Sequence, residues 1–348
     1  MMLFSQYRGF LITLVPASIG GFFWSYLGLP LAWLMGAAVV TGSLSIYGLM
    51  VQLPKQLYWP SLCVIGAGVG LTITPDVAVK IATYFPIMAV MAFVGVVLAL
   101  IATPLVARKG NMKASTAFFS LMPGGVIEMA NIGGPHGADR TTIATLHAVR
   151  VALVVGILPL SLYFLFPNAS VFLASHAILS PVDLAIVLAV ALAGGWIGKK
   201  VHLPASWLLG SLLAVALLTV SGSVTGQIPE ALMAVAQIIV GMSLGSKFQK
   251  ERLRHLPKAM AVGTIALLAI ILTVALLAVF ISQILPIDVP TMVLALSIGG
   301  LPEMVLTARY LELDMAMVAA FQSTRAVLVN SLAGAIWYRF HKFITQDR

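Results

Sequence analysis

The most constraining feature of the sequence is an apolar motif that occurs twice. Residues 124–129 (GGVIEM) return as residues 299–304 (GGLPEM), a shift of 175 positions (299 − 124). Other residues match at nearly the same shift: Asp139 with Asp314, Arg150 with Arg325, His147 with Gln322, Gly66 with Gly241, and Trp33 with Trp207. The chain is therefore one duplicated unit, with a carboxylate and an arginine kept at equal spacing in both copies.

The composition is that of an integral membrane protein. Hydrophobic residues make up 60% and charged residues 9% of the chain, whereas a soluble domain carries about 25% charged residues. The net charge of +9 does not indicate nucleic-acid binding, because the basic residues lie at the ends of apolar runs. The single cysteine, Cys63, excludes a disulfide framework and a thiolate metal cluster. The first apolar run lacks a small-residue cleavage site, so we expect a retained helix rather than a signal peptide.

Ten apolar segments approach the length of about 20 residues that a helix needs to cross a bilayer. They lie near 9–27, 30–50, 58–75, 80–106 and 141–166 in the first copy, and near 182–198, 204–221, 229–246, 259–285 and 315–338 in the second. Two further segments, near 113–134 and 290–311, hold the glycine pairs at mid-segment. Too few residues flank each pair for two crossings, so we expect two half-helices that meet at a tip.

Positive charge in the loops predicts how the segments run. Basic residues follow the second and fourth spans of the first copy (Lys55 and 108–113), but the first and third of the second copy (199–200 and 247–258). This change of parity predicts inverted copies, because cytoplasmic loops are the basic ones. Inversion requires an odd number of crossings, so each Gly-Gly segment is expected to enter and return. A broken crossing helix, with another span removed, stays open as an alternative.

The predicted fold is all-α and integral to the membrane, with two inverted repeats of five transmembrane helices, each carrying a re-entrant or broken Gly-Gly hairpin. The first inverted repeat spans 1–166, a linker spans 167–181, and the second inverted repeat spans 182–348. This arrangement puts both termini in the cytoplasm. We expect a multi-pass protein of the cell inner (cytoplasmic) membrane.

The glycine pairs mark a candidate substrate site. Gly124, Gly125, Gly299 and Gly300 free backbone groups at membrane depth, where an unpaired group is costly unless it faces protein, water or ligand. The N-terminus of a half-helix offers N–H groups and a positive dipole end to an anion. We interpret the tips as a substrate cradle, with close helix packing as the alternative.

Charged residues follow each glycine pair. Glu128 and Glu303 lie close to mid-membrane, and Arg150 and Arg325 follow them by 22 positions (150 − 128 and 325 − 303). One interpretation assigns the arginines to an anionic substrate and the glutamates to coupling or gating. The other makes each glutamate and its arginine a structural ion pair.

The remaining candidates are less specific. Asp139 and Asp314 begin the spans that hold the arginines, so each is either an N-cap or a coupling residue. His147 lies three residues before Arg150 and is either a packing residue or a pH-sensitive gating residue. Four further residues are candidate substrate contacts: Asn131, Ser297, Thr324 and Asn330.

The sequence resembles the membrane AbrB family. The resemblance rests on the repeated Leu-Pro-x-x-Trp-Leu-x-Gly turn (29–36 and 203–210) together with the Gly-Gly-x-x-Glu-Met segments, and it covers essentially the whole chain. This duplicated-domain family is often labelled ammonia monooxygenase and is distinct from the small DNA-binding regulators of that name. It looks like a relative of the cation/proton antiporter and anion transporter superfamily. The resemblance implies inverted repeats, discontinuous helices, a midplane site at the four glycines and an elevator-type movement.

Citrate and glutamate carriers of similar design continue their motif as Gly-Gly-x-Gly. This chain has Ile127 and Pro302 at the fourth position, so their substrates do not carry over. We expect a secondary active transporter of a small organic anion, coupled to H⁺ or Na⁺, or a uniporter, with no cofactor and no metal. The alternative is a membrane regulator or sensor that binds a small ligand without transporting it.

We do not expect an enzyme. A copper site requires clustered imidazoles, whereas the six histidines are scattered and only His136 and His147 are near each other in sequence. The expected partners are a small-molecule anion and membrane lipids, with no nucleic acid, and a homodimer is a candidate assembly.

Overall fold

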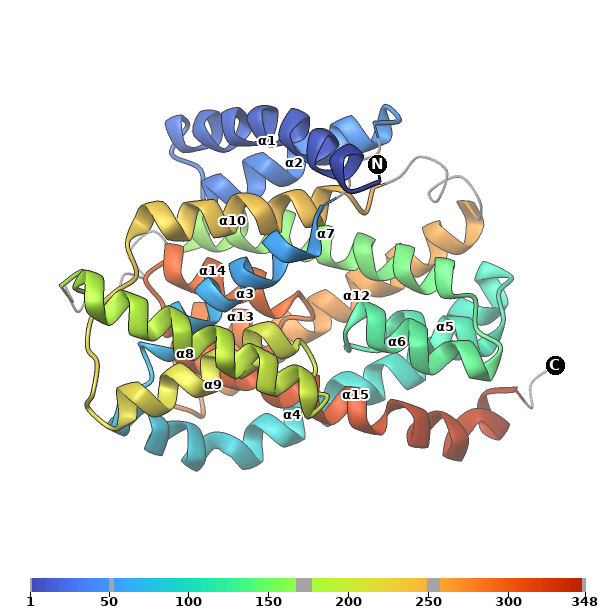
Figure 1. Cartoon of the computed structure of the whole chain (residues 1–348). Coiled ribbons are helices and arrows are strands. Elements are labelled where there is room, and N and C mark those ends of the chain that lie inside the picture. Colours follow the sequence, from blue (N-terminus) through green and yellow to red (C-terminus); the bar gives the residue numbers. More distant parts are fainter. Residues whose placement is uncertain (1, 50–52, 167–176, 249–256, 346–348) are drawn as a thin grey trace.

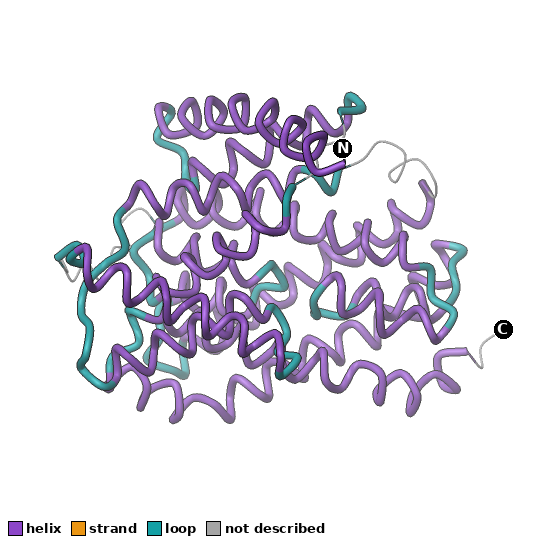
Figure 2. Tube along the Cα trace, in the orientation of Figure 1, coloured by secondary structure: helices purple, strands orange, loops and turns teal. Residues whose placement is uncertain are grey.

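The computed structural model describes residues 2–49, 53–166, 177–248 and 257–345. Within these residues the regular structure is helical apart from one isolated bridge, between Ile178 and Gln227 (Figure 2). The helices of the first copy are α1 (Met2–Tyr26), α2 (Ala32–Ile46), α3 (Lys55–Gly70), α4 (Pro75–Gly110), α5 (Ala114–Leu121), α6 (Val126–Gly133), the short η1 (Gly134–His136) and α7 (Arg140–Leu165). Those of the second copy are α8 (Pro181–Lys200), α9 (Ser206–Val220), α10 (Glu230–Gly245), α12 (Pro257–Ser282), α13 (Val289–Leu296), α14 (Leu301–Tyr310) and α15 (Met315–Thr345).

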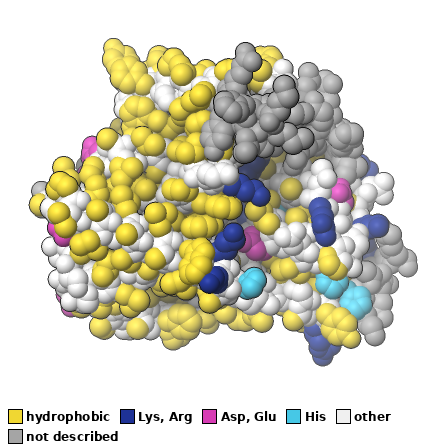
Figure 3. Space-filling model, viewed as in Figure 1, with side chains coloured by type: hydrophobic (Ala, Val, Ile, Leu, Met, Phe, Trp, Pro, Cys, Tyr) yellow, Lys and Arg dark blue, Asp and Glu magenta, His cyan; other side chains and the backbone are white. Residues whose placement is uncertain are grey.

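Each predicted span is a helix, and each Gly-Gly segment is two short helices. Five described helices are long and apolar enough to cross a membrane: α1 over Gly9–Tyr26, α4, α7, α8 and α12. Large apolar side chains such as Phe22, Ile101 and Phe280 are more than half exposed on these helices, which suits contact with lipid. In Figure 3, hydrophobic side chains cover most of the visible face, and most of the Lys, Arg and His side chains lie toward its middle and right. The membrane class is therefore supported.

Local signals set the ends of the helices. α4 begins where Thr74 accepts a hydrogen bond from the Val77 amide, and it ends where Asn111 turns left-handed with φ 51°. Leu31 and Ala205 lie at equivalent positions in the two copies, and both adopt φ near +50° (53° and 47°) before α2 and α9. Because non-glycine residues adopt this conformation uncommonly, its recurrence shows that the repeated sequence specifies a repeated turn.

Glycines allow pairs of helices to approach closely, again in both copies. A methyl group on Gly36 would collide with the carbonyl group of Gly20, and one on Gly210 with that of Gly194. These contacts bring α1 against α2 and α8 against α9. Small residues at such crossings are typical of packing between membrane helices.

One helix of each copy packs against the other copy. α3 lies against α9, where a methyl group on Gly66 would collide with the Leu208 carbonyl oxygen. α10 lies against α2, where one on Gly241 would collide with the Leu34 carbonyl oxygen. The two copies therefore interlock rather than stand side by side.

The helices form two sets, each built from both copies. The six-helix set comprises α1–α3 and α8–α10, and the broken-helix set comprises α4–α7 and α12–α15. Helices pack mainly within their own set, and α3 provides most of the packing between sets, against α14 and α15. In Figure 1, α1, α2 and α10 lie at the top of the molecule, and α4 and α15 run along the bottom.

Two predicted loops fall partly outside the described residues. The predicted linker 167–181 is described only from residue 177, and α8 already begins at Pro181. In the basic segment 247–258, residues 249–256 lie outside the described part of the chain.

Candidate functional site

Two breaks in the helices, at 122–125 and 297–300, form the candidate site. α5 ends at Leu121 and α6 begins at Val126, with Gly125 extended at φ −72° and ψ 145°. α13 ends at Leu296 and α14 begins at Leu301, with Gly300 at φ −80° and ψ 145°. Neither glycine has a positive φ, so close neighbours rather than backbone strain require glycine here.

Those neighbours are side chains of the same motif. A methyl group on Gly125 would collide with the Glu128 carboxylate, and one on Gly300 with the Glu303 carboxylate. Each glutamate is the third residue of its helix, the position from which a capping-box side chain reaches back to the N-cap. The carboxylates therefore occupy the space over the half-helix N-termini that we predicted for an anion.

The outer ends of each short-helix pair are joined. The Asp139 amide donates to Thr116 Oγ1 at 3.0 Å, and the Asp314 amide donates to Thr291 Oγ1 at 3.4 Å. Because Thr116 lies near the start of α5 and Asp139 lies beyond α6, the pair begins and ends at the same place. The second pair is closed in the same way.

Asp139 and Asp314 also cap the helices that follow. Asp139 accepts from the Thr141 amide at 3.0 Å and the Thr142 amide at 3.2 Å, and Asp314 accepts from the Met317 amide at 2.9 Å. The structure therefore gives both aspartates the N-cap role, the first of their two interpretations. A coupling role for them stays a prediction.

Arg150 holds the first break from α7. Its guanidinium group donates to the Met122 carbonyl oxygen at 2.7 Å and to the Gly124 carbonyl oxygen at 3.0 Å. One turn earlier on α7, His147 Nε2 lies 2.9 Å from the Phe119 carbonyl oxygen. These acceptors lie at the C-terminal end of α5, where unpaired carbonyl groups and the negative end of the dipole favour a cation.

Arg325 holds the second break from α15 in the same way. It donates to the Ser297 carbonyl oxygen, to that of Gly299 at 3.3 Å, and to Gln322 Oε1. Gln322 Nε2 donates to the Leu294 carbonyl oxygen at 2.8 Å. Ser297, Gly299 and Leu294 are the repeat equivalents of Met122, Gly124 and Phe119, so both breaks use the same acceptors.

The predicted ion pairs are not formed. Within the described residues, Arg150 and Arg325 bond to backbone carbonyls and Gln322, and neither is paired with Glu128 or Glu303. The carbonyl ends of α5 and α13 attract the guanidinium groups, whereas the glutamates lie over the following N-termini. The structural-pair interpretation is therefore wrong for this structure.

The two breaks meet across the repeats. Asn330 of α15 accepts a hydrogen bond from the Gly125 amide at 3.1 Å. Reciprocally, Val154 of α7 lies against Gly299, 2.9 Å from where a methyl group on it would stand. Arg150 and Arg325 are fully buried, at 3% and 9% exposed, and lie within range of electrostatic repulsion from each other.

Comparison with known proteins identifies the family. The family model described as "Transition state regulatory protein AbrB" matches residues 33–341. The chain belongs to the AbrB family. This confirms the resemblance carried by the two Gly-Gly-x-x-Glu-Met segments.

Two relatives match this chain over most of their length. The protein named "Uncharacterized protein YhjN" from Bacillus subtilis (strain 168) is 27% identical over an alignment of 350 positions, and this alignment covers 93% of this chain and 91% of the relative. The protein named "Putative regulator AbrB" from Escherichia coli (strain K12) is 25% identical over 300 residues, covering 85% and 86% of the two chains.

Sequence reasoning missed several residues around these AbrB-family breaks. Thr116 and Thr291 are separated by the repeat shift, which could have identified them. Lys247, predicted only as part of a basic loop, interacts electrostatically with Glu303. Tyr58 of α3 interacts with both Glu303 and Glu128 and forms a hydrogen bond with Ser243 of α10. No signal in the sequence connects Tyr58 or Lys247 with the motif.

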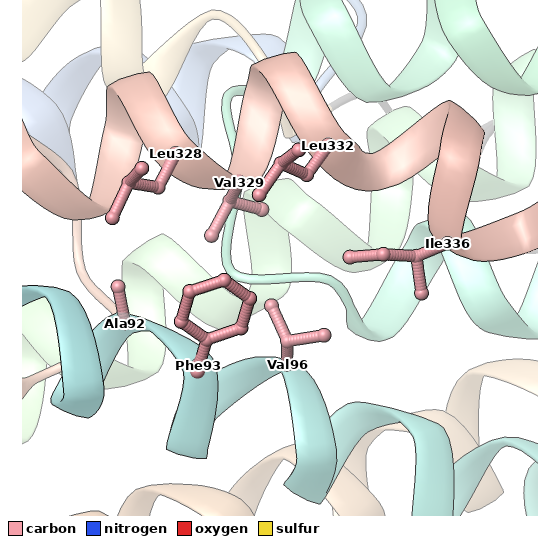
Figure 4. Close-up of a pocket in the computed structure, with 7 residues that line it drawn as sticks. All are labelled: Ala92, Phe93, Val96, Leu328, Val329, Leu332 and Ile336. Carbon is pink, nitrogen blue, oxygen red and sulfur yellow. The ribbon is translucent and has the colours of Figure 1, made fainter.

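Other predicted residues lie away from the breaks. Asn131 is exposed on α6, and Thr324 Oγ1 lies 3.8 Å from Met88 Sδ of α4. An apolar hollow between α4 and α15 (Figure 4) is also separate from the glycines; it is lined by Ala92, Phe93, Val96, Leu328, Val329, Leu332 and Ile336. Neither Asn131 nor this hollow contributes a polar group to the candidate site.

Proposed function

We propose that this AbrB-family protein is a secondary active transporter of a small organic anion, which binds where the two breaks meet. The observation that carries the proposal is the pair of buried guanidinium groups, Arg150 and Arg325. They lie within range of electrostatic repulsion, and among the described residues neither is paired with a carboxylate and the Nε atom of each lacks a hydrogen-bond partner. Buried charges are costly unless they are paired.

An anion would relieve both defects. Arg150 and Arg325 already use terminal nitrogens on the break carbonyls, which fixes each guanidinium plane and leaves Nε as a free donor. The N-termini of α6 and α14 lie beside them and add N–H groups and a positive dipole end. We propose as substrate contacts Gly124, Gly125, Glu128, Arg150, Ser297, Gly299, Gly300, Glu303 and Arg325; Asn131, exposed on α6 away from the breaks, is not among them.

Inverted repeats are the proposed frame of this site. Three contacts support opposite directions for equivalent helices: Gly110 at the end of α4 lies against Ala259 at the start of α12, Gly68 at the end of α3 lies against Met233 at the start of α10, and Tyr163 at the end of α7 lies 6.5 Å from Tyr310, just before α15. Such antiparallel equivalents suit ten crossings with two re-entrant short-helix pairs. α1 begins and α15 ends toward the right of Figure 1, which suits termini on one side, here proposed as the cytoplasmic side of the inner membrane.

The proposed transport movement is a displacement of the broken-helix set against the six-helix set. Helices pack mainly within each set, and the contacts between sets centre on α3. Glu128 and Glu303 would leave the half-helix N-termini when substrate binds there. We propose H⁺ or Na⁺ as the coupling ion, with His147, Asp139 and Asp314 as further coupling or gating candidates.

A regulator or sensor is the second candidate function. It is favoured by the name of the E. coli relative, "Putative regulator AbrB". The same anion site would then report ligand binding without movement of ligand across the membrane. In either case we propose no enzymatic activity, no cofactor and no nucleic-acid partner, with lipid around the apolar helices and a homodimer as the assembly to test.

The proposal is tested by binding and then by counterflow. The purified protein is heated with acetate, succinate or citrate, with ammonium and methylamine as cationic controls, at two pH values and with or without sodium. We expect one carboxylate class to raise the unfolding temperature in a saturable way. Arg150→Lys and Arg325→Lys keep the charge but lose the planar fork, and each is expected to weaken this stabilisation.

Proteoliposomes loaded with the stabilising anion then distinguish the two functions. Uptake of labelled anion in exchange for unlabelled anion supports a transporter, and its loss in Arg325→Lys places the site at the breaks. Saturable binding without exchange supports the regulator. Stabilisation by ammonium or methylamine alone would reject the anion site, because two buried arginines repel cations.

A further inference from the structure

The two breaks differ in one buried atom. Glu303 is 6% exposed, and its Oε2 atom has no hydrogen-bond partner in the part of the chain that the structure describes. The equivalent Glu128 is half-buried at the surface of α6 and has no such buried atom. A buried oxygen that accepts nothing is costly and calls for an explanation, so Glu303 requires a ligand that Glu128 does not.

Charged and titratable groups face Glu303 from the neighbouring helices. Lys247, just after α10, attracts it electrostatically, and Tyr58 of α3 also lies within electrostatic range. Arg325 of α15 holds the carbonyls of the same break, and Arg150 of α7 lies within range of both Arg325 and Lys247. Glu128 also lies within electrostatic range of Tyr58, but the charged groups of the described residues that interact with Glu303 or Arg325 are basic, so the ligand of Oε2 must be compatible with nearby positive charge.

The donor set favours a proton over a metal ion. A hard cation needs several oxygen ligands, but the carbonyl oxygens of Ser297 and Gly299 already accept from Arg325 and that of Leu294 accepts from Gln322. A metal ion would also be repelled by Lys247, which interacts electrostatically with Glu303. A proton needs one oxygen, and it converts a costly buried carboxylate into a neutral acid.

We infer that Glu303 is a reversible proton-binding site of the second break and that Lys247 is its counter-charge from the six-helix set. In the charged state, Glu303 and Lys247 attract each other across the boundary between the two sets. In the protonated state this attraction is lost, and one electrostatic interaction between the two sets is removed.

The proton would come from water. Lys247 and Tyr58 each keep a minor exposed fraction, so the groups around Glu303 are not closed off from the surface. The O–H bond forms at the Glu303 carboxyl group on acidification and breaks on return to higher pH, with no other bond changed. The use of this proton in coupling rests on the proposed transport function, but proton binding itself does not.

Infrared difference spectroscopy tests the inference without a substrate. The purified protein is titrated from high to low pH, and the carbonyl stretch of a protonated carboxylic acid is identified by its shift in D₂O. We expect a band that is lost in Glu303→Gln and kept in Glu128→Gln. In Lys247→Met the band should persist to higher pH, because the ammonium charge that favours the carboxylate is gone.

The results that would overturn the proton-binding inference differ from those that would refute only the transport proposal. A band that survives in Glu303→Gln, or that disappears only in Glu128→Gln, overturns the inference, as does the absence of any titrating band in the wild type. If Glu303→Gln does not elute as a monodisperse species, Glu303→Asp and Lys247→Met decide: the aspartate must keep a titrating band, and the methionine must move the wild-type band. A protein that shows the band but carries no anion in counterflow retains the proton site and refutes only the transport proposal.

Discussion

The first short-helix pair, α5–α6, and the second, α13–α14, are held by the same backbone contacts in different surroundings. An arginine from the next long helix bonds to the carbonyls of each break, and a glutamate lies over each following N-cap glycine. Yet the first break receives Asn330 from the other copy and exposes part of Glu128, whereas the second buries Glu303. Both copies therefore keep the same arginine and glutamate contacts at the break, whereas the neighbouring helices give the two breaks different surroundings.

The largest loss of stability is expected when Arg150 or Arg325 is replaced by methionine, which keeps most of the volume of the arginine's aliphatic chain. Arg325→Met leaves the Leu296 and Gly299 carbonyls and Gln322 Oε1 without their donor and removes one of two donors to the Ser297 carbonyl, whereas Arg150→Met leaves two carbonyls unpaired. Each buried group left unpaired costs about 1–3 kcal/mol. Both variants should therefore unfold at lower temperature in detergent, with Arg325→Met affected more. Equal losses would show that the second break is not the more tightly bonded one.

The next largest difference in stability between the two breaks is expected when a methyl group is added to each N-cap glycine. In Gly125→Ala the half-buried Glu128 side chain has room to rotate outward, whereas in Gly300→Ala the buried Glu303 does not. Overpacking costs about 1–3 kcal/mol, so we expect that loss in Gly300→Ala and a smaller one in Gly125→Ala. The measurement is the unfolding temperature of the two variants side by side. A larger loss in Gly125→Ala would contradict the burial difference.

Asn330 gives a smaller and more local test. Asn330→Val introduces the residue type found at the equivalent position 155 and removes the acceptor of the Gly125 amide. We expect a loss of about 1 kcal/mol, because one partly buried amide is left unpaired. Ser331→Ala, on an exposed neighbour in α15, is the matched control and should be close to neutral. If both variants behave alike, the bond between the copies contributes nothing to stability.

The smallest change in stability is expected for His147→Gln, which gives the first copy the residue type that the second copy has at the equivalent position, Gln322. Glutamine donates to the Leu294 carbonyl in the second copy, as histidine meets the Phe119 carbonyl in the first. The unfolding temperature should change by less than the equivalent of about 1 kcal/mol. His147→Leu, which removes the hydrogen bond, should cost more. A large loss in His147→Gln would instead indicate a role that only an imidazole fills.

The sequence predicts the helices and their breaks better than it predicts the contacts of the candidate site. Apolar runs and glycine pairs predict the ten long helices of the described residues and both broken segments, because periodicity and chain breaks are local properties. The repeat also predicts which arginine meets which break. It fails at Glu128 and Glu303, since spacing alone cannot tell an ion pair from a helix cap. Tyr58 and Lys247 come from distant segments, and only the packing of α3 and α10 brings them to the breaks.

The exchange of α3 and α10 between the copies has a consequence for biosynthesis. When the first copy leaves the ribosome, the glycine face of α3 has no partner, because α9 is still to be made. The glycine face of α3 in the first half must therefore stay unpaired in the bilayer until the second half has been synthesised and inserted. A single-copy ancestor would have faced the same shortage permanently, and a second molecule of itself could have supplied the missing helix. Joining two genes into one chain would then have turned an encounter between molecules into a folding step.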